Sequence, residues 1–177
     1  MTWKDLPAGP AECLAQLKAA GKAAYPVGGW VRDRLLGREA GDVDLCTAAL
    51  PEEVMALFPA AVPTGLAHGT VTVPTVSGNV EITTFRREGG YADARHPDAV
   101  TFDVGLTEDL SRRDFTVNAM ALAEDGTVVD PFGGRKDLKS GLIRCVGEAE
   151  RRFSEDALRM LRALRFKAQL GFEMEEE

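Results

Sequence analysis

The chain has 177 residues, of which 45% are hydrophobic and 28% charged, as expected of a globular protein with one core. No apolar segment reaches the roughly 18 residues of a membrane span, and the N-terminus MTWKDLPAGPAE lacks the apolar run of a secretory signal. The net charge of −7 argues mildly against a nucleic-acid partner. However, residues 144–167 are rich in arginine, so the net charge of the whole chain does not exclude one.

The three cysteines indicate a reducing, cytoplasmic setting. Cys13, Cys46 and Cys145 are widely spaced and form no C-x-x-C pair, so we expect buried thiols. His68 and His96, the only histidines, lie near none of them in the sequence, which argues against zinc.

The first half of the chain alternates short helices and strands. Hydrophobic periodicity and glycine or proline boundaries predict helices at 11–21, 30–37 and 51–58, and strands at 23–29, 41–47, 70–75 and 79–85. The last two strands flank the turn Ser77–Asn79 and should form a hairpin.

The second half has longer patterns. Residues 87–98 are polar and aperiodic, which predicts a mobile loop before a strand at 99–104. We expect a helix over 107–123, a turn-rich connection over 125–141, a strand at 142–147 and one long helix over 148–171. Without a regular β-α-β alternation, the fold class is α+β, with a mixed sheet and flanking helices.

The segment VGGWVRD, residues 27–33, has the pattern of a phosphate-binding turn. Gly28 and Gly29 allow backbone N–H groups to approach an anion, and the donors of Arg32 can reach a phosphate. Alone, such a turn is more often structural. The segment GDVDLCT follows closely and strengthens the interpretation.

In a strand, Asp42 and Asp44 lie on one face and Val43 and Leu45 on the other. Two carboxylates beside a phosphate-binding turn are what a two-metal transfer site requires, and Mg²⁺ prefers such oxygen ligands. An isolated D-x-D is usually a solvated strand face. Glu81 is a candidate third carboxylate or an exposed edge residue.

Two more clusters combine charge with periodicity. In SRRDFTVNAMA, Arg112, Arg113 and Asp114 form either a surface ion-pair cluster or part of the site, and the half-buried Asn118 needs defined partners. In SEDALRMLRALRF every third residue from 156 to 165 is charged.

This second stripe is either a solvated helix face or a device that selects a base. An Asp–Arg pair can accept from the exocyclic amine of cytosine or adenine and donate to ring acceptors, whereas uracil and guanine present a carbonyl. Asp156 and Arg159 form such a pair, and Arg162 and Arg165 suit a triphosphate.

Together, these motifs resemble bacterial CCA-adding enzymes, the tRNA nucleotidyltransferases of the polymerase-beta superfamily that share a class with bacterial poly(A) polymerases. From Tyr25 to Gly171 the chain has, in the family's order, VGGWVRDRLLG, GDVDLCT, HGTVTV, SRRDFTVNAMA, DPFGGRKDL and ERRFSEDALRMLRALRF. The resemblance implies a polymerase-beta-like head over residues 1–138 and the start of an all-helical neck over 139–177, with the C-terminal body and tail absent.

The resemblance also implies roles for individual residues. The D-x-D pair of the family binds two catalytic Mg²⁺ ions, and other motif residues contact the nucleotide or read its base. On this sequence the metal ligands would be Asp42 and Asp44, the nucleotide contacts Gly29, Arg32, Arg113, Arg162 and Arg165, and the base-reading pair Asp156 and Arg159.

The implied activity is template-independent transfer of CMP and AMP from CTP and ATP to the 3′ end of tRNA, with no membrane partner and no oligomeric state fixed by the motifs. The full-length loop at 87–98 favours CCA or A addition, because CC-adding relatives lack much of it. Three alternatives stay open: an A-adding enzyme or poly(A) polymerase, a catalytically silent nucleotide- or RNA-binding module, and a two-metal phosphohydrolase.

Overall fold

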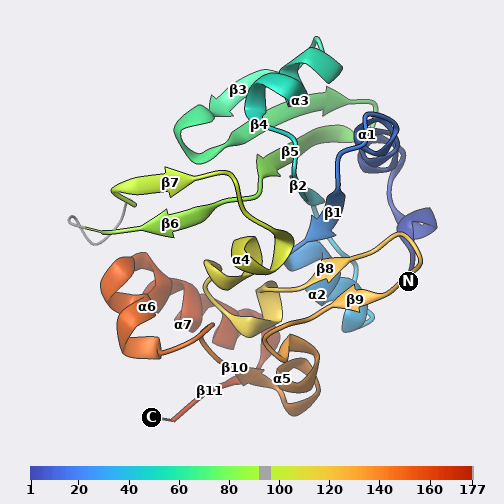
Figure 1. The fold of residues 1–177 in the computed structure, drawn as a ribbon. Helices are drawn as coiled ribbons and strands as arrows, with labels where there is room; N and C mark the ends of the chain where they lie inside the picture. Colours follow the sequence, from blue (N-terminus) through green and yellow to red (C-terminus); the bar gives the residue numbers. More distant parts are fainter. Residues whose placement is uncertain (92–96, 177) are drawn as a thin grey trace.

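A seven-stranded mixed sheet forms the centre of the computed structural model, which describes residues 1–91 and 97–176 (Figure 1). The strand order is β3-β4-β5-β2-β1-β8-β9. Their bounds are β1 Ala24–Val27, β2 Asp44–Thr47, β3 Val62–Gly65, β4 Thr70–Thr75, β5 Gly78–Thr84, β8 Ala121–Leu122 and β9 Val128–Val129. Two small sheets pair β6 Arg87–Gly89 with β7 Ala99–Thr101, and β10 Leu142–Ile143 with β11 Glu173–Met174.

Neighbours in the large sheet are antiparallel except for β2 and β5. Val27 at the end of β1 faces Asp44 at the start of β2, and Leu45 faces Ile82 on β5. This register places Asp44 beside the turn that follows β1 and next to Glu81 on the neighbouring strand.

Helices cover both faces of the sheet. They are α1 Ala8–Ala19, α2 Gly29–Leu35, α3 Pro51–Leu57, α4 Leu106–Ser111, α5 Gly134–Ser140, α6 Ala149–Glu155 and α7 Leu158–Leu170, with 3-10 turns at Trp3–Asp5, Leu66–His68 and Thr116–Asn118. Leu45 belongs to the large hydrophobic cluster on one face, and its neighbour Cys46 to a smaller cluster on the other. The alternation of β2 therefore joins two cores.

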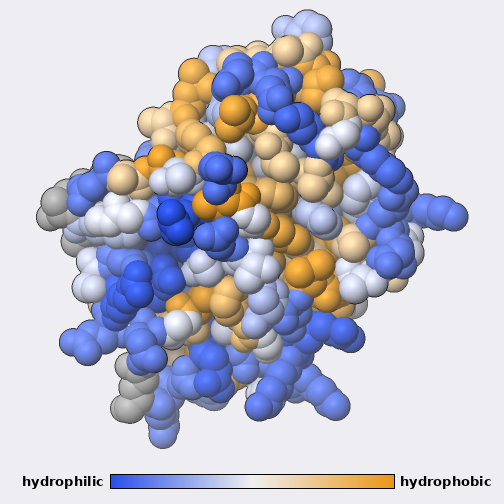
Figure 2. All heavy atoms as spheres, in the orientation of Figure 1, coloured by the Kyte–Doolittle hydropathy of each residue, from blue (hydrophilic) through white to orange (hydrophobic). Residues whose placement is uncertain are grey.

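Most of the predicted elements are confirmed. Leu14 and Leu17 on α1 are fully buried, Pro51 opens α3, and Gly37 and Gly171 follow α2 and α7 with positive φ angles. The three cysteines are buried, as predicted. In Figure 2, hydrophilic side chains gather over α5 and α6. No helix within the described ranges is long and apolar enough to cross a membrane.

The predicted helix over 107–123 is wrong beyond Ser111. The backbone of residues 114–116 pairs with residues 144–146 instead: Phe115 bridges Cys145, and the Val146 N–H donates to the Asp114 carbonyl. These long-range hydrogen bonds replace those that a continuing helix would make. The chain then forms the short 3-10 turn and enters the sheet as β8.

The predicted long helix over 148–171 is broken in two at Asp156. This residue is extended, with φ −149° and ψ 105°, and its Oδ1 accepts a hydrogen bond from the Leu158 N–H. Such local side-chain bonding competes with helix continuation.

Two further regions also differ from the prediction. The supposed connection over 125–141 contains α5, whose first N–H groups are capped by Asp130. The supposed loop over 87–98 begins with strand β6 and hydrogen-bonds to β7, while its residues 92–96 lie outside the described part of the chain.

Candidate active site

The glycine turn between β1 and α2 requires its glycine. Gly28 has φ +70°, which L side chains rarely adopt, and a Cβ there would lie 3.2 Å from Nη1 of Arg113. The Gly28 backbone and the Arg113 guanidinium therefore lie close together where the sequence predicts a phosphate-binding turn.

A chain of hydrogen bonds leads from this turn to α7. Arg32, which is 4% exposed, donates from Nη1 to Oδ1 of Asn118 over 2.7 Å. Asn118 donates to Oδ1 of Asp114 over 3.3 Å, and Arg162 donates to the other Asp114 oxygen over 2.7 Å. The prediction that Asn118 has defined partners is confirmed, although it lies on a 3-10 turn and not on a helix.

The Phe166 ring organises three guanidinium groups around itself. Those of Arg32, Arg162 and Arg165 lie 5.1, 5.6 and 5.0 Å from the ring centroid, within the range of cation–π attraction. Phe115 packs against the ring edge-on. Since three like charges gather at one place, the arrangement favours a multiply charged anion.

Carboxylates lie on the other side of the glycine turn. Burial, followed by the neighbouring Glu81 and Asp42 charges, raises the pKa of Asp44, although Arg113 acts in the opposite sense. The prediction placed Asp42 and Asp44 on one strand, but β2 begins at Asp44 and Asp42 lies before it. The predicted alternation is nevertheless present, since both aspartates are exposed and Val43 and Leu45 are buried.

The donor chemistry of these carboxylates suits Mg²⁺. No three His, Cys, Asp or Glu side chains converge into a metal-binding group among the described residues. However, Mg²⁺ is usually held by one or two carboxylates together with substrate phosphates, and the repulsion at Asp44 is of the kind that a cation relieves. Asp42, Asp44 and Glu81 therefore fit the ion, whereas Asp114 is bonded to Arg162.

The two residues predicted to read the base do not lie on one face of a single helix. Asp156 lies at the break between α6 and α7, and its Oδ2 makes no hydrogen bond within the described chain. Arg159 is only 7% exposed and donates to Glu155, to the Arg152 carbonyl and to the Arg112 carbonyl. Burial alone would lower the pKa of Arg159, but the hydrogen bond to Glu155 and the interactions with Tyr91, Glu155 and Asp114 outweigh it and raise the pKa. Three of its five donors are thus engaged.

These groups line one cavity of about 840 Å³. Of the predicted site residues it brings together Gly28, Gly29, Arg32, Asp44, Arg113, Asp156, Arg159, Arg162 and Arg165. Asp42 does not line the cavity but is close enough to affect Asp44.

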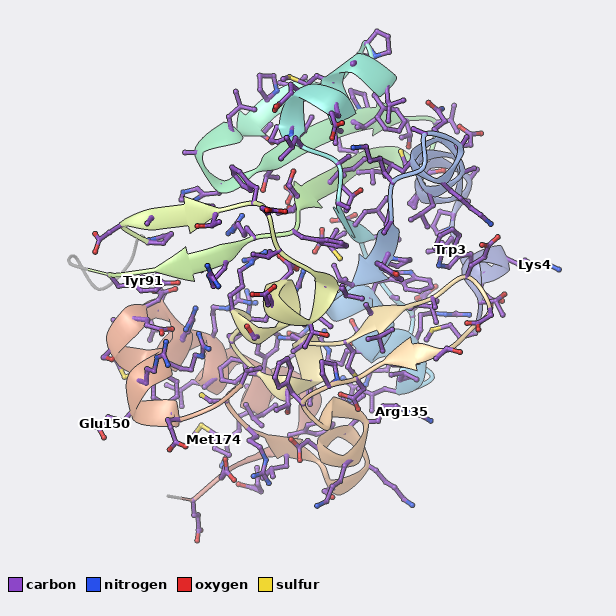
Figure 3. All side chains as sticks on the ribbon, in the orientation of Figure 1. Trp3, Lys4, Tyr91, Arg135, Glu150 and Met174 are labelled. Carbon is purple, nitrogen blue, oxygen red and sulfur yellow. The ribbon has the colours of Figure 1, made fainter. Side chains whose placement is uncertain are left out.

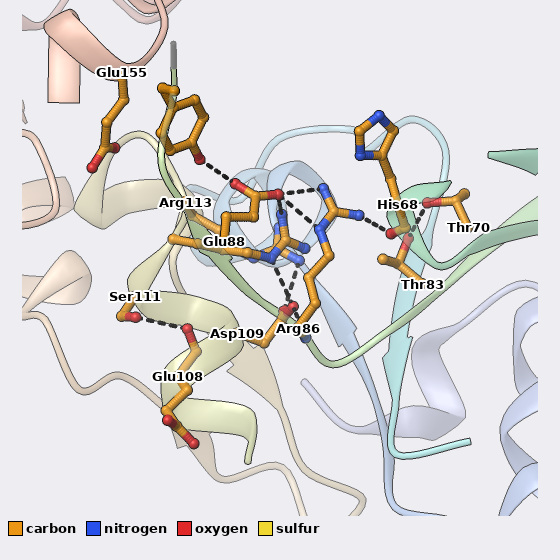
Figure 4. Close-up of polar contacts among 12 residues, drawn as sticks. His68, Thr70, Thr83, Arg86, Glu88, Glu108, Asp109, Ser111, Arg113 and Glu155 are labelled. Atoms are coloured by element: carbon orange, nitrogen blue, oxygen red, sulfur yellow. Dashed lines mark hydrogen bonds and ion pairs between the residues drawn. The ribbon is translucent and has the colours of Figure 1, made fainter. Parts of the chain in front are cut away.

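The prediction missed one wall of this cavity, a network at the base of the β6–β7 hairpin (Figure 4). Glu88 accepts hydrogen bonds from Arg86, Arg112 and Tyr91, and Arg86 also donates to the His68 carbonyl. Burial opposes ionisation of Glu88, but these partners outweigh it and lower its pKa. Figure 3 shows Tyr91 at the end of β6, facing α6. Only the HGT segment and the charged start of the loop hinted at this wall.

Residues 24–144 match the family described as "Poly A polymerase head domain", and the chain therefore belongs to this family of head domains. Its similarity to CCA-adding enzymes is close. That of Geobacillus stearothermophilus is 57% identical over 159 residues, covering 90% of this chain and 39% of the relative. That of Leuconostoc mesenteroides is 57% identical over 162 residues, covering 92% and 40%.

Solved structures show the same relationship. The Bacillus stearothermophilus CCA-adding enzyme in complex with CTP superposes with a TM-score of 0.85 and 53% identity, over 93% of this chain and 39% of that one. The Thermotoga maritima CCA-adding enzyme complexed with tRNA gives a TM-score of 0.72 and 30% identity, over 93% and 38%. The chain thus spans about two fifths of the length of these relatives.

Proposed function

We propose that this chain is the nucleotidyltransferase head and the start of the neck of a cytoplasmic enzyme that adds CMP and AMP from CTP and ATP to the 3′ end of tRNA. One observation carries the proposal: the phosphate-binding turn, Asp44 and the Asp156–Arg159 pair line a single cavity. The relatives named CCA-adding enzymes support the choice of reaction.

In the proposed reaction, the primer 3′-oxygen attacks the α-phosphorus of the nucleotide. The bond between the α- and β-phosphates breaks, and pyrophosphate leaves. Asp42 and Asp44 would hold two Mg²⁺ ions, with Glu81 as the auxiliary carboxylate. Bound Mg²⁺ lowers the pKa of the 3′-hydroxyl and neutralises charge that develops on the α-phosphate.

The remaining groups position the nucleotide. Arg32, Arg113, Arg162 and Arg165 would bind the triphosphate, since this kind of transfer depends mainly on orientation and electrostatics. Asp156 would accept from the exocyclic amine of cytosine or adenine through the oxygen that makes no bond in the described chain.

The test uses a tRNA that lacks its terminal CCA, supplied with each nucleoside triphosphate singly and in pairs. We expect C from CTP alone and the full CCA from CTP with ATP. Repeated incorporation of A alone would favour an A-adding enzyme or poly(A) polymerase, and pyrophosphate release without primer would favour a phosphohydrolase. Asp44→Ala should abolish incorporation, whereas Asp125→Ala, an exposed change in the β8–β9 turn, should not.

A further inference from the structure

Asp109 on α4 is a fully buried carboxylate outside the cavity lining. Its Oδ1 accepts hydrogen bonds from the backbone N–H of Arg86 over 3.2 Å and from the side-chain Nε of Arg112 over 2.9 Å. Its Oδ2 lies 3.6 Å from Nη2 of Arg113. A buried charge is costly unless its partners compensate it, and here all the partners belong to segments that form the cavity wall (Figure 4).

Arg113 connects this buried charge to the glycine turn. One side of its guanidinium faces Asp109, and Nη1 on the other side lies against Gly28. The side chain lines the cavity and acts electrostatically on Asp44. Asp109 therefore lies behind Arg113, whose guanidinium lies between α4 and the glycine turn.

The contact between Asp109 and Arg113 is incomplete. Oδ2 of Asp109 and Nε of Arg113 are two of the three buried side-chain polar atoms that lack a hydrogen-bond partner in the described part of the chain. A separation of 3.6 Å is an ion pair but too long for a hydrogen bond. Contacts in unliganded sites are often long and tighten when the ligand binds.

From this geometry we propose that Asp109 is a positioning residue for nucleotide binding. It holds the Arg113 guanidinium over the glycine turn, and the Asp109–Arg113 contact shortens when the triphosphate binds. This role rests on the proposed function of the cavity. It differs from that of Asp137, a second buried carboxylate, which is bonded to Thr116 and Arg144 away from the cavity.

Equilibrium binding of CTP and of ATP, each with Mg²⁺, tests this role in a double-mutant cycle of Asp109→Asn and Arg113→Gln. Asp109→Asn should weaken both nucleotides by about tenfold, as expected from losing a hydrogen bond to a charged group. The loss should be equal for both, because the phosphates are common to them. The double variant should bind no worse than Arg113→Gln, since both changes remove one interaction.

The matched control is Asp137→Asn, which should lower the melting temperature but leave both dissociation constants within twofold. Binding by Asp109→Asn within twofold of wild type, or additive losses in the double variant, would overturn the role of Asp109 alone. Failure of the wild-type chain to bind either nucleotide would overturn the proposed function, and this role with it.

A measurement on the wild-type chain covers the case in which Asp109→Asn does not fold. The Nε–H resonance of Arg113, assigned with Arg113→Lys, should shift and exchange more slowly with water when CTP is added. That of Arg144, which already bonds to Asp137, should stay unchanged. An Arg113 signal that does not respond to bound CTP would contradict the proposed tightening.

Discussion

Replacing Asn118 with alanine would cut the hydrogen-bond chain between the glycine turn and α7. The amide is 6% exposed and joins Arg32 to Asp114. The substitution leaves Nη1 of Arg32 buried without this partner, while the other guanidinium nitrogens keep their bonds to Asp33. The defect is therefore local, and its size can be worked out.

Leaving a buried donor without its partner costs about 1–3 kcal/mol. We take about 2 kcal/mol, because Asp33 and Phe166 still hold Arg32, and the 3.3 Å bond to Asp114 is long. In a chain of this size each kcal/mol shifts the melting temperature by about 2–4 °C, so a drop of about 4–8 °C is expected. Affinity for CTP and ATP should fall together, because Arg32 is proposed to bind phosphate.

Thermal unfolding followed by circular dichroism, together with equilibrium nucleotide binding, measures both effects. The matched control is Asn79→Ala at the chain's other asparagine, which is exposed on β5. If Asn118→Ala melts within about 1 °C of this control and binds CTP as the wild type does, the hydrogen-bond chain does not stabilise the site as argued; the threshold is well below the shift worked out above.

Three further predictions concern Asp44, Phe166 and Cys13. Asp44→Asn should abolish transfer yet raise the melting temperature at pH 7. The gain in stability should be at most about 1 kcal/mol, because the Asp44 side chain is open to solvent on one side even though the neighbouring structure desolvates it in part, and solvent screens its repulsion. The gain should vanish near pH 3, because a raised pKa opposes folding only where the carboxyl is ionised in the unfolded chain. Phe166→Leu should weaken nucleotide binding through the three arginines around the ring, whereas Phe58→Leu, in the same core but away from the cavity, should lower stability only. Burial, then Glu12, raises the pKa of Cys13 to about 11, so at pH 8 a thiol reagent should modify it only after denaturation.

Each of these predictions has a contrary result. Loss of stability in Asp44→Asn at pH 7 would show that repulsion from Glu81 and Asp42 does not destabilise the fold. Equal nucleotide binding by the two phenylalanine variants would remove the role of the ring. Modification of native Cys13 at the rate of a free thiol would mean that the thiol is not buried in solution.

Local signals predicted the parts of the fold whose structure is decided locally. The glycine turn, α2 and the β4–β5 hairpin depend on residues close in sequence, and all three are present. The helix over 107–123 failed because the preference of its residues was overridden by pairing with residues 144–146, some 30 positions away.

The site residues also divide into those that local sequence predicts and those that only the folded chain shows. Asp44, Arg32 and the arginines of α7 carry recognisable spacing, so their gathering around one cavity could be anticipated. Phe166 could not, since an aromatic residue on an apolar helix face looks like ordinary core, and only the folded chain shows three guanidiniums around it. Asp109 has the appearance of any acidic residue in the first turn of a helix until its burial is known.

The position of Phe166 on α7 determines when the site can form while the chain is being synthesised. Arg32 leaves the ribosome before Phe166, whose ring lies against it, and the delay is on the order of ten seconds at ordinary rates of translation. Until α7 docks, the nascent chain has the glycine turn and the aspartates without Arg159, Arg162 and Arg165, which complete the lining of the cavity. If the cavity binds a nucleotide as proposed, it is therefore complete only after α7 has docked.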